Sequence, residues 1–247
     1  MSALALRILA MLLMLIDHVG VLFTLPLPLT VLLRALGRIS FPIFAFLIAN
    51  GMQHTKNRLR YVLCLLGFAL ISEPFFDFAL RHTLWHPDHQ NVFFTLFLGA
   101  LGIFVLDHCK KRTPLWHILG ISIVAILLLC ARVLHTDYDA FGVALILFLS
   151  IFWQKKAATA VTVLLFSLRE LGLHLYAAFI LGASDLTPQR WDLITLCAAI
   201  SILPILLYNG KKGYTPKNQT AALLFKYGFY LFYPLHLLLL ITVAAIF

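Results

Sequence analysis

The sequence predicts an all-α protein, a polytopic integral membrane helix bundle that forms a single transmembrane domain over residues 1–247. Hydrophobic residues make up 62% of the chain and charged residues only 12%. A soluble domain has roughly 45–50% apolar and about 25% charged residues. The apolar residues also stand in long runs separated by short polar stretches, which is typical of membrane proteins. We therefore expect no soluble domain of ordinary size.

Nine apolar segments predict the membrane spans. A helix that crosses the bilayer needs about 20 mostly apolar residues, and the fourth and sixth segments are shorter than this. The expected spans are 4–25, 31–53, 61–80, 91–107, 115–134, 139–153, 157–181, 190–208 and 225–247. The longest gap between them, near 208–225, has the composition of a turn.

The charges between the segments predict the orientation of the chain. Alternate loops, starting after the second expected span, contain twelve basic residues: Lys56, Arg58, Arg60, Lys110, Lys111, Arg112, Lys155, Lys156, Lys211, Lys212, Lys217 and Lys226. The opposite loops contain about one each: Arg34, Arg81, Arg132 and Arg190. Because cytoplasmic loops are enriched in lysine and arginine, we expect a cytoplasmic N-terminus and a periplasmic C-terminus.

The net charge of +9 does not indicate nucleic acid as a partner, because the basic residues fall in short clusters between apolar runs. That distribution is the one that membrane topology requires, so the expected partner is the lipid bilayer. The four cysteines are scattered, with no CxxC motif and no histidine at metal spacing. Neither a disulfide framework nor a metal site is expected.

Ionisable residues inside the expected spans are the first functional signal, since each costs about 2.5–3.5 kcal/mol at a helix centre. The first span contains Arg7, Asp17 and His18. Arg7 and His18 are eleven residues apart, so they share one helix face at a separation of roughly 16 Å. A histidine there is suited to act as a general base. The alternative is a structural histidine bonded to a neighbouring helix.

Arg38, Glu73 and Asp77 form a second candidate set in the next two spans. The fixed charge of Arg38 needs a carboxylate or an anionic ligand. Glu73 and Asp77 are four residues apart and share a helix face, where two carboxylates repel unless a proton or a cation intervenes. Arg38 is a candidate for that cation, and a plain ion pair is the alternative to a site.

Two further pairs are secondary candidates. Glu170 and His174 are four residues apart in the seventh expected span, beside Arg169, and local neutralisation is the simpler interpretation. Tyr233 and His236 are three residues apart in the last span, so their side chains are expected to be neighbours. Pro234 between them is expected to bend the helix.

A basic, glycine-containing loop precedes the last span and contains Asn209, Gly210, Lys211 and Lys212. Backbone amides near glycine can bind phosphate, so the loop and Arg7 together suggest a cytoplasmic mouth for a phosphorylated donor. A loop that only follows the positive-inside rule would look the same.

Three stretches together resemble the TraX family. They are IDHVG at 16–20, GRISFPIFAF at 37–46, and LYNGKKG at 207–213 followed by KY at 226–227 and YPLHL at 233–237. The family is named for the enzyme that acetylates the N-terminus of conjugative pilin. It is similar to a larger group of transmembrane acyltransferases whose first span carries a basic residue, ten residues and then a histidine. Arg7 and His18 match that spacing.

The resemblance implies a bacterial inner-membrane acetyltransferase with acetyl-CoA as donor and His18 as the catalytic histidine. Asp17 or Glu73 would orient the imidazole, and Arg38 would stabilise the oxyanion. The acceptor would be a pilin-like protein or a glycan near the outer face. A proton-coupled transporter or flippase that uses the same ionisable residues is the rival interpretation.

Overall fold

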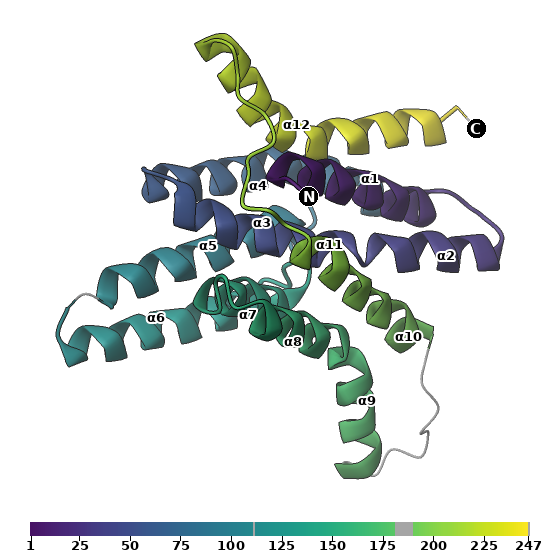
Figure 1. Cartoon of the computed structure of the whole chain (residues 1–247). Helices are drawn as coiled ribbons and strands as arrows, with labels where there is room; N and C mark the ends of the chain where they lie inside the picture. The colour runs from purple at the N-terminus through teal and green to yellow at the C-terminus, as the bar shows by residue number, and fades with distance from the viewer. Residues whose placement is uncertain (111, 181–189, 247) are drawn as a thin grey trace. The chain divides into compact units, whose positions relative to one another are not determined.

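The computed structural model describes residues 1–110, 112–180 and 190–246, and it is built almost entirely of helices (Figure 1). The described residues form no β-strand, and only an isolated bridge joins Gln90 and Thr136. The prediction of an all-α protein is confirmed. Lys111, together with the ends of the expected spans at 181 and 247, lies outside the described residues.

Six candidate spans are long and apolar enough to cross a membrane within the described ranges. They are α1 (Ala3–Leu22), the pair α2 (Leu27–Gly37) and α3 (Ser40–His54), α4 (Arg58–Arg81), α5 (Val92–Cys109), α6 (Pro114–Val133) and α12 (Gln219–Ala244). Side-chain caps start four of them, because Ser2, Asn57, Asn91 and Asn218 each accept a hydrogen bond from a backbone N–H of the first turn. The chain is therefore a multi-pass membrane protein.

The other three expected spans are helical but short or broken, so the count of nine straight spans is not confirmed. Helix α7 (Asp139–Ile151) has 13 residues, about 20 Å against a hydrocarbon core of about 30 Å. Helices α8 (Lys156–Ser167) and α9 (Arg169–Ile180) meet at a bend of 48°. The segment 190–206 is divided into α10 (Arg190–Leu196), a 3₁₀ turn (Cys197–Ser201) and α11 (Ile202–Leu206).

The chain divides into two compact units, each assembled from separate stretches of sequence. Unit 1 comprises Met1–Phe44 and Gln154–Tyr214, and unit 2 comprises Ala45–Trp153 and Thr215–Phe247. In unit 1, α1 packs against α2, which also contacts α10. In unit 2, α5 packs against α4, α6 and α7, and α12 packs against α4.

Glycine allows α1 and α2 to approach each other closely. A Cβ atom on Gly20 would lie 2.9 Å from the Cβ of Leu33, and one on Gly37 would overlap the side chain of Asp17. Distances this short do not occur between real Cβ atoms, so the two helices can meet here only because both residues lack a side chain. The contact brings Asp17 to the end of α2.

Helix α12 bends, as Pro234 predicts. Figure 1 shows its first arm and its yellow C-terminal arm running in different directions. Proline lacks the N–H that would bond to the preceding turn, and its ring displaces that turn. Aromatic rings hold α12 to its neighbours in unit 2: Tyr230 stacks on Phe68 with ring centroids 4.9 Å apart, and Tyr233 meets Phe93 edge-on at 5.3 Å.

Candidate functional site

An ion-pair cluster joins α1 to α2 in unit 1. Arg34 donates a hydrogen bond of 2.6 Å from Nη1 to Oδ2 of Asp17, and Nη2 of Arg38 lies 3.9 Å from Oδ1 of the same carboxylate. The side chains of Asp17 and both arginines are only 15–16% exposed. A charge this far from water needs a partner of opposite sign. The sequence predicted that Arg38 needs a carboxylate or an anionic ligand, and Asp17 is such a carboxylate within unit 1.

His18 lies on the side of α1 that faces the protein. Leu6, Ala10 and Met14 form a buried row at intervals of four residues, and His18 takes the next place in that row and is half-buried. Arg7 is also half-buried and lies roughly 16 Å from His18 along the helix axis. Consecutive residues on a helix point in different directions, so Asp17 turns toward α2 while His18 continues the buried row.

The basic loop is docked on the N-terminal end of α1. The backbone N–H groups of Ala3 and Leu4 donate hydrogen bonds of 2.9 and 3.0 Å to the carbonyls of Lys211 and Lys212. Asn209 donates from its own N–H to the carbonyl of Met1 at 2.9 Å. These first N–H groups of α1 have no partner within the helix, and the loop satisfies them. Arg7 is one helical turn further along.

Two glycines give this loop its shape. Gly210 and Gly213 have φ angles of 76° and 85°, a region that residues with a side chain rarely adopt. A Cβ atom on Gly213 would lie 2.6 Å from Cβ of Ser2 and 3.1 Å from Cβ of Leu4, whereas Gly210 faces open space. Gly213 therefore sets the close approach of the loop to α1.

Glu73 is fixed in unit 2 by Asn91. Its Oε2 atom accepts a hydrogen bond of 3.1 Å from the backbone N–H of Asn91 and a second one from the side-chain amide of the same residue. The amide also donates to the carbonyl of Ala69 at 2.8 Å. Glu73 is 4% exposed, and the structure records no hydrogen bond to its Oε1 atom from any described residue.

Asp77 accepts a hydrogen bond of 2.7 Å from the backbone N–H of His86. The sequence predicted that Glu73 and Asp77 would need a proton or a cation to share one helix face. In the structure, separate N–H donors serve the two carboxylates: Asn91 donates to Glu73, and His86 donates to Asp77. Both carboxylates thus have hydrogen-bond donors from unit 2, and Arg38, the cation that the sequence suggested for them, belongs to unit 1.

The secondary candidates occupy defined places. Tyr233 and His236 are buried neighbours in α12, with ring centroids 5.4 Å apart, as their spacing predicts. The Nδ1 atom of His236 lies 2.9 Å from the carbonyl of Phe232. In α9, Glu170 pairs with Arg169 at 3.3 Å, which is the local neutralisation considered as the simpler interpretation.

His174 does not pair with Glu170 but lies with its Nδ1 atom 3.5 Å from Oδ2 of Asp192 in α10. Its Nε2 atom is buried and has no recorded hydrogen bond from the described part of the chain. The contact joins α9 to α10 within unit 1. A histidine oriented by a carboxylate on one nitrogen can exchange a proton on the other.

Unit 1 thus has Arg7 near the loop 209–212 at one end of α1, and toward the other end it pairs Asp17 with Arg34 and Arg38, with His18 next to Asp17 in the sequence. Glu73, Asp77, Tyr233 and His236 belong to unit 2. Sequence reasoning missed Arg34, which it assigned to an outer loop. Its signal was the spacing from Arg38: residues four apart on a helix share a face, so one carboxylate can reach both.

Two comparisons with known proteins match almost the whole chain. A family model described as "TraX protein" matches residues 2–244. A protein of Dichelobacter nodosus named "Probable fimbrial assembly protein FimC, serogroup H1" is 28% identical over 249 aligned residues, which cover 97% of this chain and 94% of that protein. None of the solved structures matches the chain significantly. Since the family model spans nearly the whole sequence, the chain belongs to the TraX protein family.

Proposed function

We propose that the protein is a membrane-embedded acetyltransferase that moves an acetyl group from cytoplasmic acetyl-CoA to an acceptor near the outer face of the bacterial inner membrane. One observation carries the proposal: a single helix, α1, has a basic loop docked on its N-terminal end and a histidine beside an aspartate–arginine cluster toward its other end. The first end suits a phosphorylated donor, and the second suits proton transfer.

The donor would bind at the loop end of α1. Lys211 and Lys212 supply two ammonium groups, and Arg7 adds a guanidinium one turn into the helix. Lysine binds phosphate as a point charge and arginine binds it with two parallel hydrogen bonds. Asn209 and Gly210 shape the turn that presents these groups, because Asn209 accepts from the N–H of Lys211 at 3.1 Å.

His18 would act as the general base. The acceptor amine or hydroxyl attacks the thioester carbon, and its proton passes to the imidazole as the new bond forms. The tetrahedral oxyanion that results would be stabilised by Arg38. The C–S bond then breaks, the acetyl group stays on the acceptor, and the CoA thiolate takes the proton from the imidazolium.

Asp17 would position the arginines in this scheme. Its carboxylate is committed to Arg34 at 2.6 Å and approaches Arg38 at 3.9 Å. Its role would be to hold Arg38 at the reaction centre and to balance part of the positive charge there. The sequence suggested that Asp17 or Glu73 orients the imidazole of His18. The proposal gives this role to neither residue, because Asp17 is paired with the arginines and Glu73 belongs to unit 2.

A pilin-like protein is the acceptor that the comparisons favour. The resemblance described above implies an enzyme that acetylates conjugative pilin, and the Dichelobacter nodosus relative is named as a probable fimbrial assembly protein. We therefore place the protein in pilus biogenesis, with the N-terminal amine of a pilin-like subunit as acceptor. A glycan is the other acceptor to test.

The topology that serves this function has a cytoplasmic N-terminus and a periplasmic C-terminus. It follows if the nine apolar segments cross the bilayer in turn, with α7 and the segment 190–206 as short spans and α8–α9 as a broken one. Such broken helices line sites in other membrane proteins, because irregular backbone is tolerated only where protein or water surrounds it.

The test uses the full chain in nanodiscs with radiolabelled acetyl-CoA and a membrane extract that contains pilin-like subunits. We expect transfer of label by the wild type and its loss in His18→Ala. His108→Ala is the matched control, since this exposed histidine at the end of α5 belongs to no proposed catalytic group. Label transfer by His18→Ala at near wild-type rate would remove His18 from the chemistry.

A proton-coupled transporter is the second candidate, and Glu73 favours it. This carboxylate is buried in α4, and the described residues leave its Oε1 atom without a hydrogen bond. Buried carboxylates in spans are typical proton carriers. Absence of acetyl transfer in the wild type, combined with proton uptake that Glu73→Gln abolishes, would replace the acetyltransferase with this function.

A further inference from the structure

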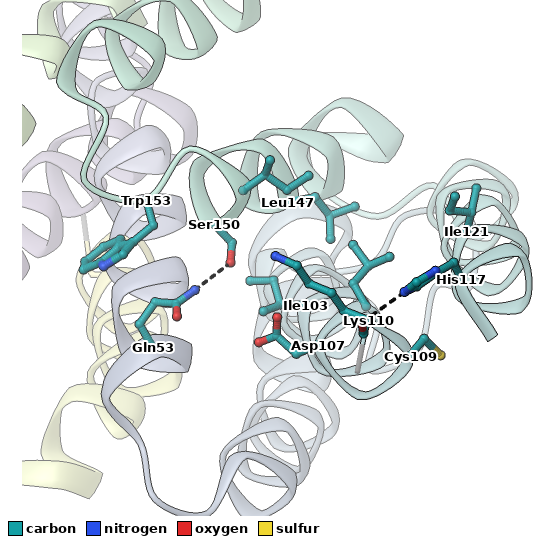
Figure 2. A pocket seen from close by; sticks show the side chains of 12 residues that line it. Gln53, Ile103, Asp107, Cys109, Lys110, His117, Ile121, Leu147, Ser150 and Trp153 are labelled. Carbon is teal, nitrogen blue, oxygen red and sulfur yellow. Dashed lines mark hydrogen bonds between the residues drawn. The ribbon is translucent and has the colours of Figure 1, made fainter. Parts of the chain in front are cut away.

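Unit 2 contains a pocket of about 510 Å³ that the acetyl-transfer scheme does not use (Figure 2). It is formed where four helices approach their ends. Its polar lining comes from Gln53 in α3, Asp107 and Lys110 at the end of α5, His117 in α6 and Ser150 in α7. A volume of this size is within the range of small-molecule sites.

The pocket lies at the basic ends of the helices. Arg58, at the start of α4, pairs with Asp107 of the lining, and Lys56 and Arg112 lie in the turns that follow α3 and α5. Trp153 lines the pocket, and Trp116 lies under the guanidinium of Arg112 at 4.4 Å. Tryptophan is enriched at the level of the lipid headgroups, so both observations place the pocket at the edge of the bilayer.

Positive charge is in excess around this pocket. Asp107 is neutralised by Arg58, whose Nη1 atom lies 2.5 Å from Oδ2. The structure records no ion pair for Lys110 among the described residues, and Figure 2 shows its side chain extending into the pocket. Two other polar side chains of the lining bond to each other, since Gln53 donates a hydrogen bond of 3.1 Å to Oγ of Ser150. The Lys110 ammonium is therefore the charge that a ligand would meet.

The pocket also has an apolar side that continues along α6. Ile103, Leu147 and Ile121 line it, and Ile121 is 64% exposed. Further along the same side of the helix, Ala125 and Leu129 follow at intervals of four residues and are exposed, Leu129 by 61%. An acyl chain can lie along these residues while its headgroup occupies the polar part of the pocket.

We propose that this pocket binds the phosphate-bearing headgroup of an anionic bilayer lipid, with Lys110 as its charge partner and the exposed face of α6 as the path of an acyl chain. Basic pockets between transmembrane helices bind such headgroups in other proteins. The proposal stands apart from the acetyltransferase assignment, because all its residues lie between 53 and 153 in unit 2.

Native mass spectrometry of the full chain in detergent tests this site. The protein is titrated with phosphatidylglycerol or with phosphatidylcholine of the same acyl chains, and the binding constant of the first lipid is measured for each. We expect a preference for phosphatidylglycerol that falls about fivefold in Lys110→Gln, from the usual contribution of one lysine near an anionic lipid surface. Lys110→Arg retains the charge and should keep the preference.

Lys56→Gln is the matched control, because it removes one lysine from the same end of unit 2 but does not line the pocket. An equal loss in Lys56→Gln and Lys110→Gln would show a diffuse surface charge and overturn the proposal. Displacement of phosphatidylglycerol by millimolar glycerol 3-phosphate would show a site for free phosphate and would also overturn it. An unchanged preference in Lys110→Gln would have the same consequence.

Discussion

At the scale of single residues, Asp17 is a carboxylate that two arginines hold in unit 1. It pairs with Arg34 of α2 and with Arg38, the residue that follows this helix, and all three side chains are largely removed from solvent. Breaking a buried pair by removing one partner is far more harmful than removing both, because the remaining charge keeps its desolvation cost. The role of Asp17 can therefore be separated from its effect on folding by double substitution.

Asp17→Asn should lower the free energy of unfolding by about 3 kcal/mol, because it leaves two guanidinium groups without their carboxylate. The double substitution Asp17→Asn with Arg34→Gln should recover part of that loss. Equilibrium unfolding in mixed detergent micelles measures both values. Strictly additive losses would contradict the direct pairing of Asp17 with Arg34.

At the scale of elements, close contacts through glycine determine how α1 meets its neighbours. Gly37 lets α2 lie against Asp17, and Gly213 lets the basic loop lie against Ser2 and Leu4. These glycines are adjacent to the two ends of the proposed site. Substitutions that add only a methyl group therefore probe each end without changing charge.

Gly37→Ala should destabilise the protein by about 1–3 kcal/mol, since the added Cβ overlaps the Asp17 side chain and the helices must separate. The matched control is Gly67→Ala in α4, where a Cβ meets nothing within 4 Å. That control should be neutral or stabilising by up to about 1 kcal/mol, because alanine is the better helix former. Thermal unfolding in detergent gives both values, and equal midpoints would refute the close approach.

Gly213→Ala should raise the KM for acetyl-CoA, because the Cβ meets Ser2 at 2.6 Å and forces the loop away from α1. Gly210→Ala has the same unfavourable φ region but open space around it. It should therefore have the smaller effect. Steady-state kinetics with acetyl-CoA as the varied substrate compare them. A larger effect of Gly210→Ala would mean that backbone strain, and not docking on α1, dominates the loop.

At the scale of the whole molecule, the parity of the spans decides which side each terminus occupies. Six spans place both termini on the same side of the membrane, whereas seven or nine place them on opposite sides. The structure supplies six long candidates, a seventh if the bent pair α8–α9 crosses as one, and two short apolar helices. The loop charges predict opposite sides.

Fusions test this prediction directly. Alkaline phosphatase, which is active only in the periplasm, should be active after residue 246 and inactive when inserted after Lys212. A fluorescent protein that matures only in the cytoplasm should give the reverse pattern. Equal activity of the two fusions would place residues 212 and 246 on the same side of the membrane, so α12 would not cross it, and would exclude the topology proposed above.

The amino-acid sequence by itself determined the membrane class, the positions of the nine apolar helical segments, the bend of α12 at Pro234 and the common face of Arg7 and His18. These follow from hydropathy and helical periodicity, which depend on residues within a few turns of one another. The resemblance to the TraX family was also carried by short contiguous motifs.

Only the tertiary structure decided which groups meet across helices. It paired Asp17 with Arg34, Glu73 with Asn91 and His174 with Asp192, and it docked the basic loop on the first residues of α1. It also showed that α7 and the segment 190–206 are too short or too broken to be read as straight spans. Hydropathy reports how apolar a segment is, but it does not report whether the segment forms one unbroken helix. Contacts between helices depend on how closely the helices approach each other, and a glycine such as Gly37 can set that distance. The pattern of residues within one helix does not predict it.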